Sequence, residues 1–95
     1  MKFVWDANKA ASNVRKHGIR FDEVVEVFFD PSSVTFPDEM HSTNEARLIT
    51  IGNSKRSRIL LVVHTETNIE SNDVIIRIIS ARRATRTERS TYEES

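Results

Sequence analysis

Two runs of β-branched and aliphatic residues, 58–66 and 74–81, constrain this chain most, because only a short polar connector at 68–73 separates them. Such residues favour strands. A parallel pair needs a crossover of a dozen or more residues, so this connector predicts an antiparallel hairpin. A third run, 47–51, ends at the turn signal Gly52-Asn53-Ser54. Together with a short strand at 33–36, these runs predict an antiparallel sheet of about four strands. Residues 2–5 alternate weakly and could form a short first strand.

Helices are predicted before and after these strand-like runs in the sequence. Asp6 is a good N-cap, and apolar residues then recur with helical spacing up to Gly18, which suits the left-handed position after a helix. The stripe consists of Ala7, Ala10, Ala11 and Val14. A second helical pattern follows and is stopped by Asp30-Pro31. Thr85 and Glu88 fit a capping box, which predicts a last helix. The expected fold is α+β, one domain of 95 residues with an N-terminal helix pair and a short C-terminal helix.

Composition excludes several classes of protein. No cysteine is present, so a disulfide framework, a thiolate zinc site and a cysteine nucleophile are all excluded. The N-terminal segment MKFVWDANKA has no long apolar region of the kind found in secretory signals, and the longest apolar run, 59–63, is too short to cross a membrane. We therefore expect a soluble, cytoplasmic protein.

The net charge is zero, but the two halves of the chain differ. Residues 1–46 hold five bases against eight acids, whereas residues 47–89 hold nine bases against four acids. Such a split suggests that one half binds an anion. On charge alone, mutual neutralisation of the two halves across the fold is an equal alternative.

The stretch 75–92 runs from the last strand into a cluster of arginines, and the search for a site begins there. A guanidinium group suits phosphate because its planar fork donates two parallel hydrogen bonds. Side chains alternate along a strand, so Arg77 and Arg83 are expected on one face and Arg82 on the other, unless a bulge at Ser80-Ala81 re-aims them.

His64 and Glu66 share a face at the end of the strand 58–66, and they could meet Arg82 and Arg83 near one end of the sheet. Such a group suits RNA cleavage without a metal. The 2′-hydroxyl must lose a proton, the leaving 5′-oxygen must gain one, and the phosphorane needs cationic stabilisation. Residue types alone favour a plainer interpretation, in which Glu66 forms a surface ion pair and His64 is a polar edge residue.

A metal site receives little support. His41, Asp38 and Glu39 are close in sequence, but their spacing matches no known ligand pattern, so a solvated polar loop is expected at 37–44. No glycine-rich phosphate loop or serine–histidine–aspartate arrangement is visible. We expect neither a metal nor a cofactor.

Three motifs and a central segment resemble a known family. The motifs are WDANK near the start, KHGIRF after the first predicted helix and IISARRAT at the last strand, and the segment is HSTNEARLITIGNS. In this order and spacing, from about residue 3 to residue 93, the chain resembles the BrnT family of type II toxins.

The resemblance implies a RelE/ParE-like fold and a ribonuclease activity that blocks translation. It also implies a BrnA-type antitoxin that folds against the toxin, carries a DNA-binding domain and represses the shared operon with it. The residues that the resemblance marks by position are Arg82, Arg83, Glu66, Lys16 and His17.

The sequence therefore leads to the hypothesis of a metal-independent endoribonuclease. Arg82 and Arg83 are expected to contact the phosphate and the transition state, and Glu66 or His64 to transfer protons. The residues expected to bind RNA are Lys16, His17, Arg47, Arg77 and Arg86. Two alternatives stay open at this point: an inhibitory binding protein like the gyrase-poisoning relatives of this fold, and a plain interaction module whose arginines bind only the antitoxin.

Overall fold

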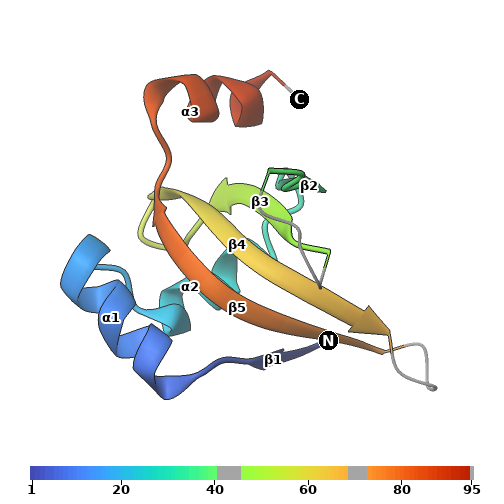
Figure 1. Cartoon of the computed structure of the whole chain (residues 1–95). Coiled ribbons are helices and arrows are strands. Elements are labelled where there is room, and N and C mark those ends of the chain that lie inside the picture. Colours follow the sequence, from blue (N-terminus) through green and yellow to red (C-terminus); the bar gives the residue numbers. More distant parts are fainter. Residues whose placement is uncertain (41–45, 69–72, 95) are drawn as a thin grey trace.

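The computed structural model describes residues 1–40, 46–68 and 73–94, and in this part the chain forms three helices and five strands (Figure 1). In chain order they are β1 (Lys2–Val4), α1 (Ala7–His17), α2 (Phe21–Val27), β2 (Val34–Pro37), β3 (Leu48–Asn53), β4 (Ile59–Asn68), β5 (Val74–Arg83) and α3 (Arg86–Glu93). The α+β class is confirmed. His41 and most of the connector 68–73 lie outside the described residues. None of the described helices has the length and hydropathy of a membrane span.

The five strands form one sheet in the order β1-β5-β4-β3-β2. β2, β3, β4 and β5 pair antiparallel in succession, as their short connectors predict. β1 corrects the prediction of an antiparallel sheet of about four strands. It is a fifth strand and pairs parallel to β5, with Lys2 opposite Ile75 and Val4 opposite Arg77, so the sheet is mixed. The connector rule could not reveal this pair, because most of the chain lies between its two strands.

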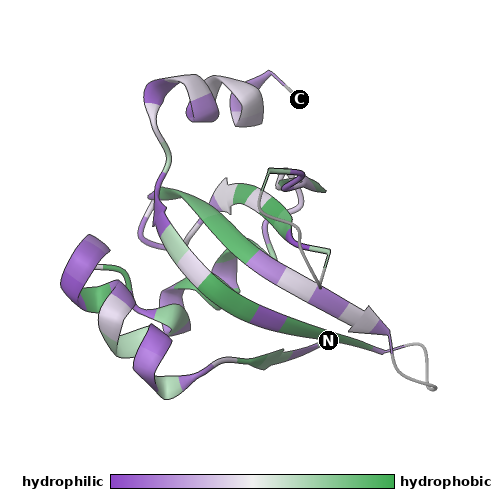
Figure 2. Ribbon diagram, viewed as in Figure 1, coloured by the Kyte–Doolittle hydropathy of each residue, from purple (hydrophilic) through white to green (hydrophobic). Residues whose placement is uncertain are grey.

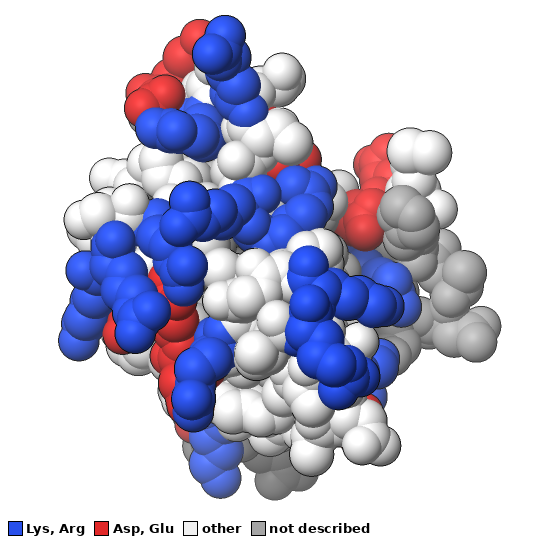
Figure 3. All heavy atoms as spheres, turned by 90° about the vertical axis from the view of Figure 1, so that its left-hand side faces the viewer, with Lys and Arg blue, Asp and Glu red and all other residues white. Residues whose placement is uncertain are grey.

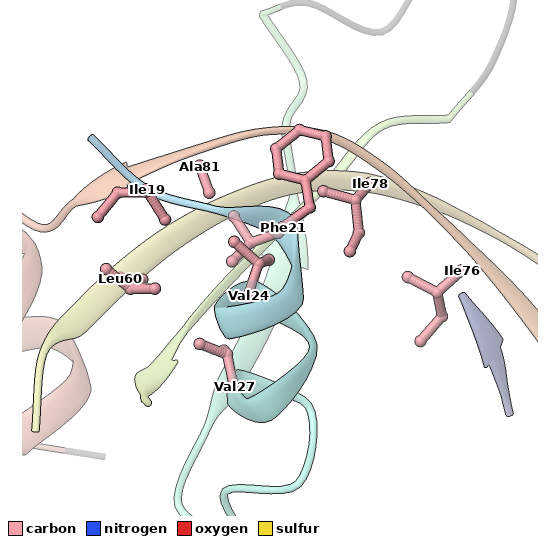
Figure 4. Packing of buried hydrophobic residues seen from close by; sticks show 9 residues of the cluster. Ile19, Phe21, Val24, Val27, Leu60, Ile76, Ile78 and Ala81 are labelled. Carbon is pink, nitrogen blue, oxygen red and sulfur yellow. The ribbon is translucent and has the colours of Figure 1, made fainter. Parts of the chain in front are cut away.

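The hydrophobic core lies between one face of the sheet and the N-terminal helices. α1 packs against β5, and α2 packs against β3, β4 and β5 (Figure 1). Residues of α2 and of the turn before it meet residues of β4 and β5 there (Figure 4): Ile19, Phe21, Val24, Val27, Leu60, Ile76, Ile78 and Ala81. Full burial of one such aliphatic side chain contributes about 1.5–3 kcal/mol. Hydrophobic residues accordingly run along much of β4 and β5 (Figure 2). We call this the helix face of the sheet and the other the open face.

α1 has the ends that the sequence predicts, but it turns a different side to the sheet. The Asp6 carboxylate accepts a hydrogen bond from the amide of Lys9, and Gly18 adopts the left-handed conformation at φ 69°. The predicted stripe is largely exposed, with 44% of Val14 accessible, while Asn13 is buried. Asn13 faces inward because its side chain pairs two backbone groups: it accepts from the amide of Ala81 (2.9 Å) and donates to the carbonyl of Ile19 (3.0 Å).

A register shift in the β4–β5 ladder decides where the arginines point. Val63 pairs with Ser80 and His64 pairs with Ile78, so Ile79 is an extra residue on β5. A bulge of this kind reverses the alternation of side chains beyond it. A bulge at Ser80-Ala81 was considered from the sequence. The extra residue in the structure is Ile79, one position earlier.

α3 follows β5 and stands over the sheet beside β3 (Figure 1). Its sequence is polar throughout, and none of its residues is buried (Figure 2). The predicted capping box is present: the Thr85 hydroxyl accepts from the amide of Glu88, and the Glu88 carboxylate accepts from the amide of Thr85. At the other end of the helix, the Tyr92 hydroxyl donates to the Asp30 carboxylate at 2.7 Å. The capping box therefore stabilises the start of α3, and the bond from Tyr92 ties its end to the segment after α2.

Candidate active site

A hollow of about 380 Å³ lies on the open face, between the sheet and the start of α3. Its polar lining consists of His17, Asp38, Arg47, Ser80, Arg82 and Glu88. Its apolar lining includes Ile49, Leu61 and Val63, which the register places on the open face of β3 and β4. Pockets that hold small molecules in proteins have volumes of about 300–1,000 Å³, so the hollow has room for part of a nucleotide chain. We call it the active-site hollow.

Arg82 is the most firmly held side chain of this hollow. It stands near the end of β5 opposite Leu61, and its guanidinium donates two hydrogen bonds to the Glu88 carboxylate, from Nη1 to Oε1 at 2.8 Å and from Nη2 to Oε2 at 2.9 Å. These bonds, ahead of the bonds from Thr85, lower the pKa of Glu88 and raise that of Arg82. Both groups are therefore charged at neutral pH, and Glu88 holds the arginine fork in a fixed orientation.

The other polar groups reach the hollow from three elements. His17 is in the last turn of α1, where the helix dipole favours a cation. Asp38 follows β2, and its amide donates to the carbonyl of Arg47, which directly precedes β3. This backbone bond continues the β2–β3 ladder by one step and keeps Asp38 beside Arg47. The hollow thus joins side chains that lie far apart in the sequence.

His64 was predicted to act in catalysis, but the structure places it away from this hollow. The ring is fully buried on the helix face, with an edge-to-face contact to Phe28 and a 2.7 Å hydrogen bond between Nε2 and the Thr50 hydroxyl. Burial lowers the pKa of His64 to about 4. At neutral pH the ring is uncharged and has no access to a substrate, so its position argues against proton transfer to RNA.

Glu66 is exposed near the end of β4, with its Oε1 3.9 Å from Nδ1 of His64. The two residues share the predicted face. Arg82, however, pairs with Leu61, and five residues along a strand span about 16 Å. An odd spacing also puts Glu66 on the face opposite to Arg82. The structure therefore does not bring Glu66 and Arg82 together.

The bulge also separates the two neighbouring arginines. Arg83 pairs with Leu60, a core residue, so it lies on the helix-face side of the sheet, whereas Arg82 and Arg77 share the open face. Strict alternation had placed Arg77 with Arg83. Arg77 lines a separate hollow beside Trp5 and Lys9.

The remaining residues expected to bind RNA are spread over the surface. Lys16 is exposed in the last turn of α1, and Arg86 is exposed at the first position of α3. Of the five predicted RNA-binding residues, His17 and Arg47 line the active-site hollow together with Arg82.

Two residues of the hollow were not predicted from the sequence: Asp38 as part of its lining, and Glu88 as the partner of Arg82. A signal for the second was present. The capping box fixes the Glu88 carboxylate at the start of α3, and only two residues separate that start from the end of β5. The signal for Asp38 was weaker, because its place depends on the pairing of β2 with β3.

The active-site hollow has the chemistry of an anion site. Two arginines and a histidine face a cavity with an apolar floor, where charge interactions are stronger than in bulk water, and the carboxylates of Asp38 and Glu88 lie beside them in the lining. In the described part of the chain, no three histidine or acidic side chains are grouped as metal ligands. Fold and hollow together define a small α+β protein with a charged hollow at one end of a mixed sheet, where two guanidinium groups could receive a phosphate-like group.

Comparison with known proteins identifies the family to which this chain belongs. The family model for the ribonuclease toxin BrnT of type II toxin–antitoxin systems matches residues 5–88, and the chain belongs to this family. Among solved structures, the 1.1 Å crystal structure of the Brucella abortus ribonuclease toxin BrnT is similar, with 29% identity and a TM-score of 0.68, over 90% of this chain and 99% of that one. No curated protein matches the chain. Membership in the family gives the chain a ribonuclease activity and an antitoxin as its partner.

Proposed function

We propose that this toxin is a metal-independent endoribonuclease whose reaction takes place in the active-site hollow. Arg82 and Arg47 hold the scissile phosphate, and His17 transfers a proton. The observation that carries the proposal is the convergence of these three side chains on one hollow with an apolar floor. This differs from the assignment by sequence, because His64 is buried and Glu66 lies about 16 Å along the strand on the other face.

The chemistry proposed is attack by the 2′-oxygen on the adjacent phosphorus. The 2′-hydroxyl loses its proton, the bond from phosphorus to the 5′-oxygen breaks, and that oxygen takes up a proton. The products are a 2′,3′-cyclic phosphate and a 5′-hydroxyl. Negative charge grows on the phosphorane oxygens, and guanidinium groups that are already in position stabilise it without a metal. His17 is the histidine of the hollow, and the imidazole ring is the side chain that proteins use most often for proton transfer.

Glu88 has a defined part in this proposal. Its carboxylate occupies the two guanidinium nitrogens of Arg82 that a phosphate would also use. A phosphate either displaces Glu88 or binds at the remaining edge of the guanidinium. Glu88 thus keeps the charged fork oriented toward the hollow before RNA arrives, as preorganised sites require.

The setting of this activity follows from the family. A type II toxin has a protein antitoxin. We propose that this antitoxin is of the BrnA type and carries the operator-binding domain of the complex. We also propose a RelE/ParE-like relationship for the fold, and cleavage of cytoplasmic RNA that blocks translation. These statements rest on the resemblance of the sequence motifs.

The test is cleavage of labelled RNA by the purified chain, with and without a chelator, followed by analysis of the product ends. Arg82→Gln is expected to lower kcat by about 10²–10³, the usual cost of removing one group that stabilises transition-state charge. His17→Gln should lower kcat, because glutamine cannot transfer a proton in place of the imidazole.

Glu66→Gln is the comparison that decides between the two assignments. It should retain kcat if the reaction takes place in the active-site hollow, whereas loss of activity in a folded Glu66→Gln protein would move the site to the end of β4. Magnesium-dependent cleavage that leaves 5′-phosphates would reject the mechanism.

A further inference from the structure

A second hollow, of about 360 Å³, lies at the end of the sheet beyond the active-site hollow. Arginines line it from three elements: Arg56 from the β3–β4 turn, Arg83 from the end of β5 and Arg89 from α3. Figure 3 shows the side of the molecule that is on the left in Figure 1, and lysine and arginine side chains cover much of it. We call this second hollow the arginine hollow.

The three arginines have no acidic partner within ion-pair distance among the described residues. The contrast with Arg58, which lines the same hollow, is informative. Arg58 pairs with the buried carboxylate of Glu23, which also accepts a hydrogen bond from the Ser54 hydroxyl. Glu23 is thus already engaged by Arg58, and no acid lines the hollow among the described residues, so the positive charges of Arg56, Arg83 and Arg89 repel each other until an anion enters.

The backbone that carries these arginines is well held. The turn closes through hydrogen bonds from the amide of Ser54 to the carbonyl of Arg58 and from the amide of Ser57 to the carbonyl of Ser54, both 2.9 Å. The amide of Ala84 donates to the carbonyl of Ile59, also at 2.9 Å, and fixes the end of β5 against the start of β4. The cationic groups therefore project from fixed points of the fold.

We propose that the arginine hollow binds a backbone phosphate of the RNA substrate next to the phosphate that is cleaved. Arg82 and Arg83 are consecutive residues, and the bulge turns one to each side of the sheet. An RNA strand with its scissile phosphate at Arg82 passes directly over this end of the sheet toward Arg83. Guanidinium forks match phosphate oxygens, and within the described part of the chain no aromatic side chain on which a base could stack lines the hollow. The contact is therefore sequence-independent.

This inference rests on the proposed function, because it takes RNA as the substrate. The test measures binding of an RNA oligonucleotide whose 2′-hydroxyls are blocked by methylation, and cleavage of the unmodified oligonucleotide. The probe variant is the double substitution Arg83→Gln/Arg89→Gln. The matched control, Lys2→Gln, removes an exposed charge about 25 Å along the sheet, because Lys2 pairs with Ile75. Equal melting temperatures confirm that all proteins are folded.

The double variant should bind roughly tenfold more weakly at low salt and raise KM, with kcat unchanged. For single strands, each phosphate contact contributes about 0.7 to the slope of log Kd against log salt, so losing the one phosphate held in this hollow should lower the slope by about 0.7. A dinucleotide substrate has one phosphate and should be cleaved equally by the wild type and the double variant. Lys2→Gln should behave as wild type with both substrates.

Three results would overturn the inference. Wild-type affinity and salt slope in the double variant would show that RNA does not reach the arginine hollow. An equal loss of activity with the dinucleotide would place Arg83 at the reacting phosphate instead. Unchanged RNA binding together with lost affinity for the antitoxin would assign the hollow to an acidic segment of that partner. A wild-type chain that cleaves no RNA would refute the proposed function, while the methylated oligonucleotide would still test the subsite.

Discussion

Acidification from pH 7 to pH 4 is expected to destabilise this protein through His64. The ring is fully buried, with Phe28 against it and Thr50 on Nε2, and Nδ1 has no hydrogen-bond partner in the described structure. Burial lowers the pKa of the folded state from 6.5 to about 4. Between these two values the unfolded chain binds a proton that the folded chain does not, so stability falls as the pH falls.

The size of the effect follows from the two pKa values. Each unit of difference corresponds to 1.36 kcal/mol, so the loss is about 3 kcal/mol once the pH is below 4. Most of the loss occurs between pH 6.5 and pH 4. Glu66 is the carboxylate nearest to the ring, with Oε1 3.9 Å from Nδ1, and its attraction for a protonated ring makes 3 kcal/mol an upper value. The total stability of a domain of this size is about 5–15 kcal/mol, so the loss is readily measurable.

The assay is urea denaturation at half-unit steps from pH 7.5 to pH 4, with His64→Leu as the reference. Leucine is close in size and does not titrate, so the difference between the two curves isolates His64. Carboxylates with lowered pKa values, such as Glu23 and Glu88, also stabilise the fold less as the pH falls. This loss is the same in both proteins, so it cancels in the difference between the two curves. Parallel curves over this range would refute the reasoning, as would a wild type that is more stable at pH 5 than at pH 7.

Two further predictions concern packing and hydrogen bonding. Gly52→Ala should lower the free energy of unfolding by about 1–3 kcal/mol, because the new Cβ would lie 2.8 Å from Cγ1 of Val27 and 3.0 Å from Cβ of Ser33. An unchanged urea midpoint would show that α2 moves away from the new methyl group without cost. Asn13→Ala should cost about 2–4 kcal/mol, because it leaves two buried backbone groups unpaired, whereas the exposed Asn8→Ala on the same helix should change stability by less than about 0.5 kcal/mol. Equal urea midpoints for the Asn13 and Asn8 variants would contradict this account.

Local signals in the sequence were reliable where the chain meets only its near neighbours. The N-cap at Asp6, the left-handed Gly18 and the capping box of Thr85 and Glu88 all depend on residues within one or two turns, and all three are confirmed. The antiparallel order of β2–β5 followed from short connectors in the same way. The parallel partner of β5 was not predictable, because β1 lies some seventy residues away and carries only a weak alternation.

The site was less predictable because it depends on which face each strand residue takes. A single extra residue moves every later side chain to the other face of the sheet. The segment Ile78-Ile79-Ser80 carries no glycine or other residue that marks such a bulge. The apolar stripe on α1 was misleading for a related reason. Of its residues, Ala10 packs against the core, but the most buried side chain of α1 is Asn13, which makes two hydrogen bonds to backbone groups.

The bulge also explains why the neighbouring residues Arg82 and Arg83 line two different hollows. Without Ile79 as an extra residue, strict alternation from Ile76 and Ile78 would carry Arg82 onto the helix face, where a guanidinium would replace the small, buried Ala81. Burial of an unpaired charge costs several kcal/mol, so the shifted register is the stable one. Asn13 supports this register, because its side chain accepts the amide of Ala81 at the part of β5 that β1 does not cover. One buried asparagine on α1 and one extra residue on β5 therefore set Arg82 toward the active-site hollow and Arg83 toward the arginine hollow.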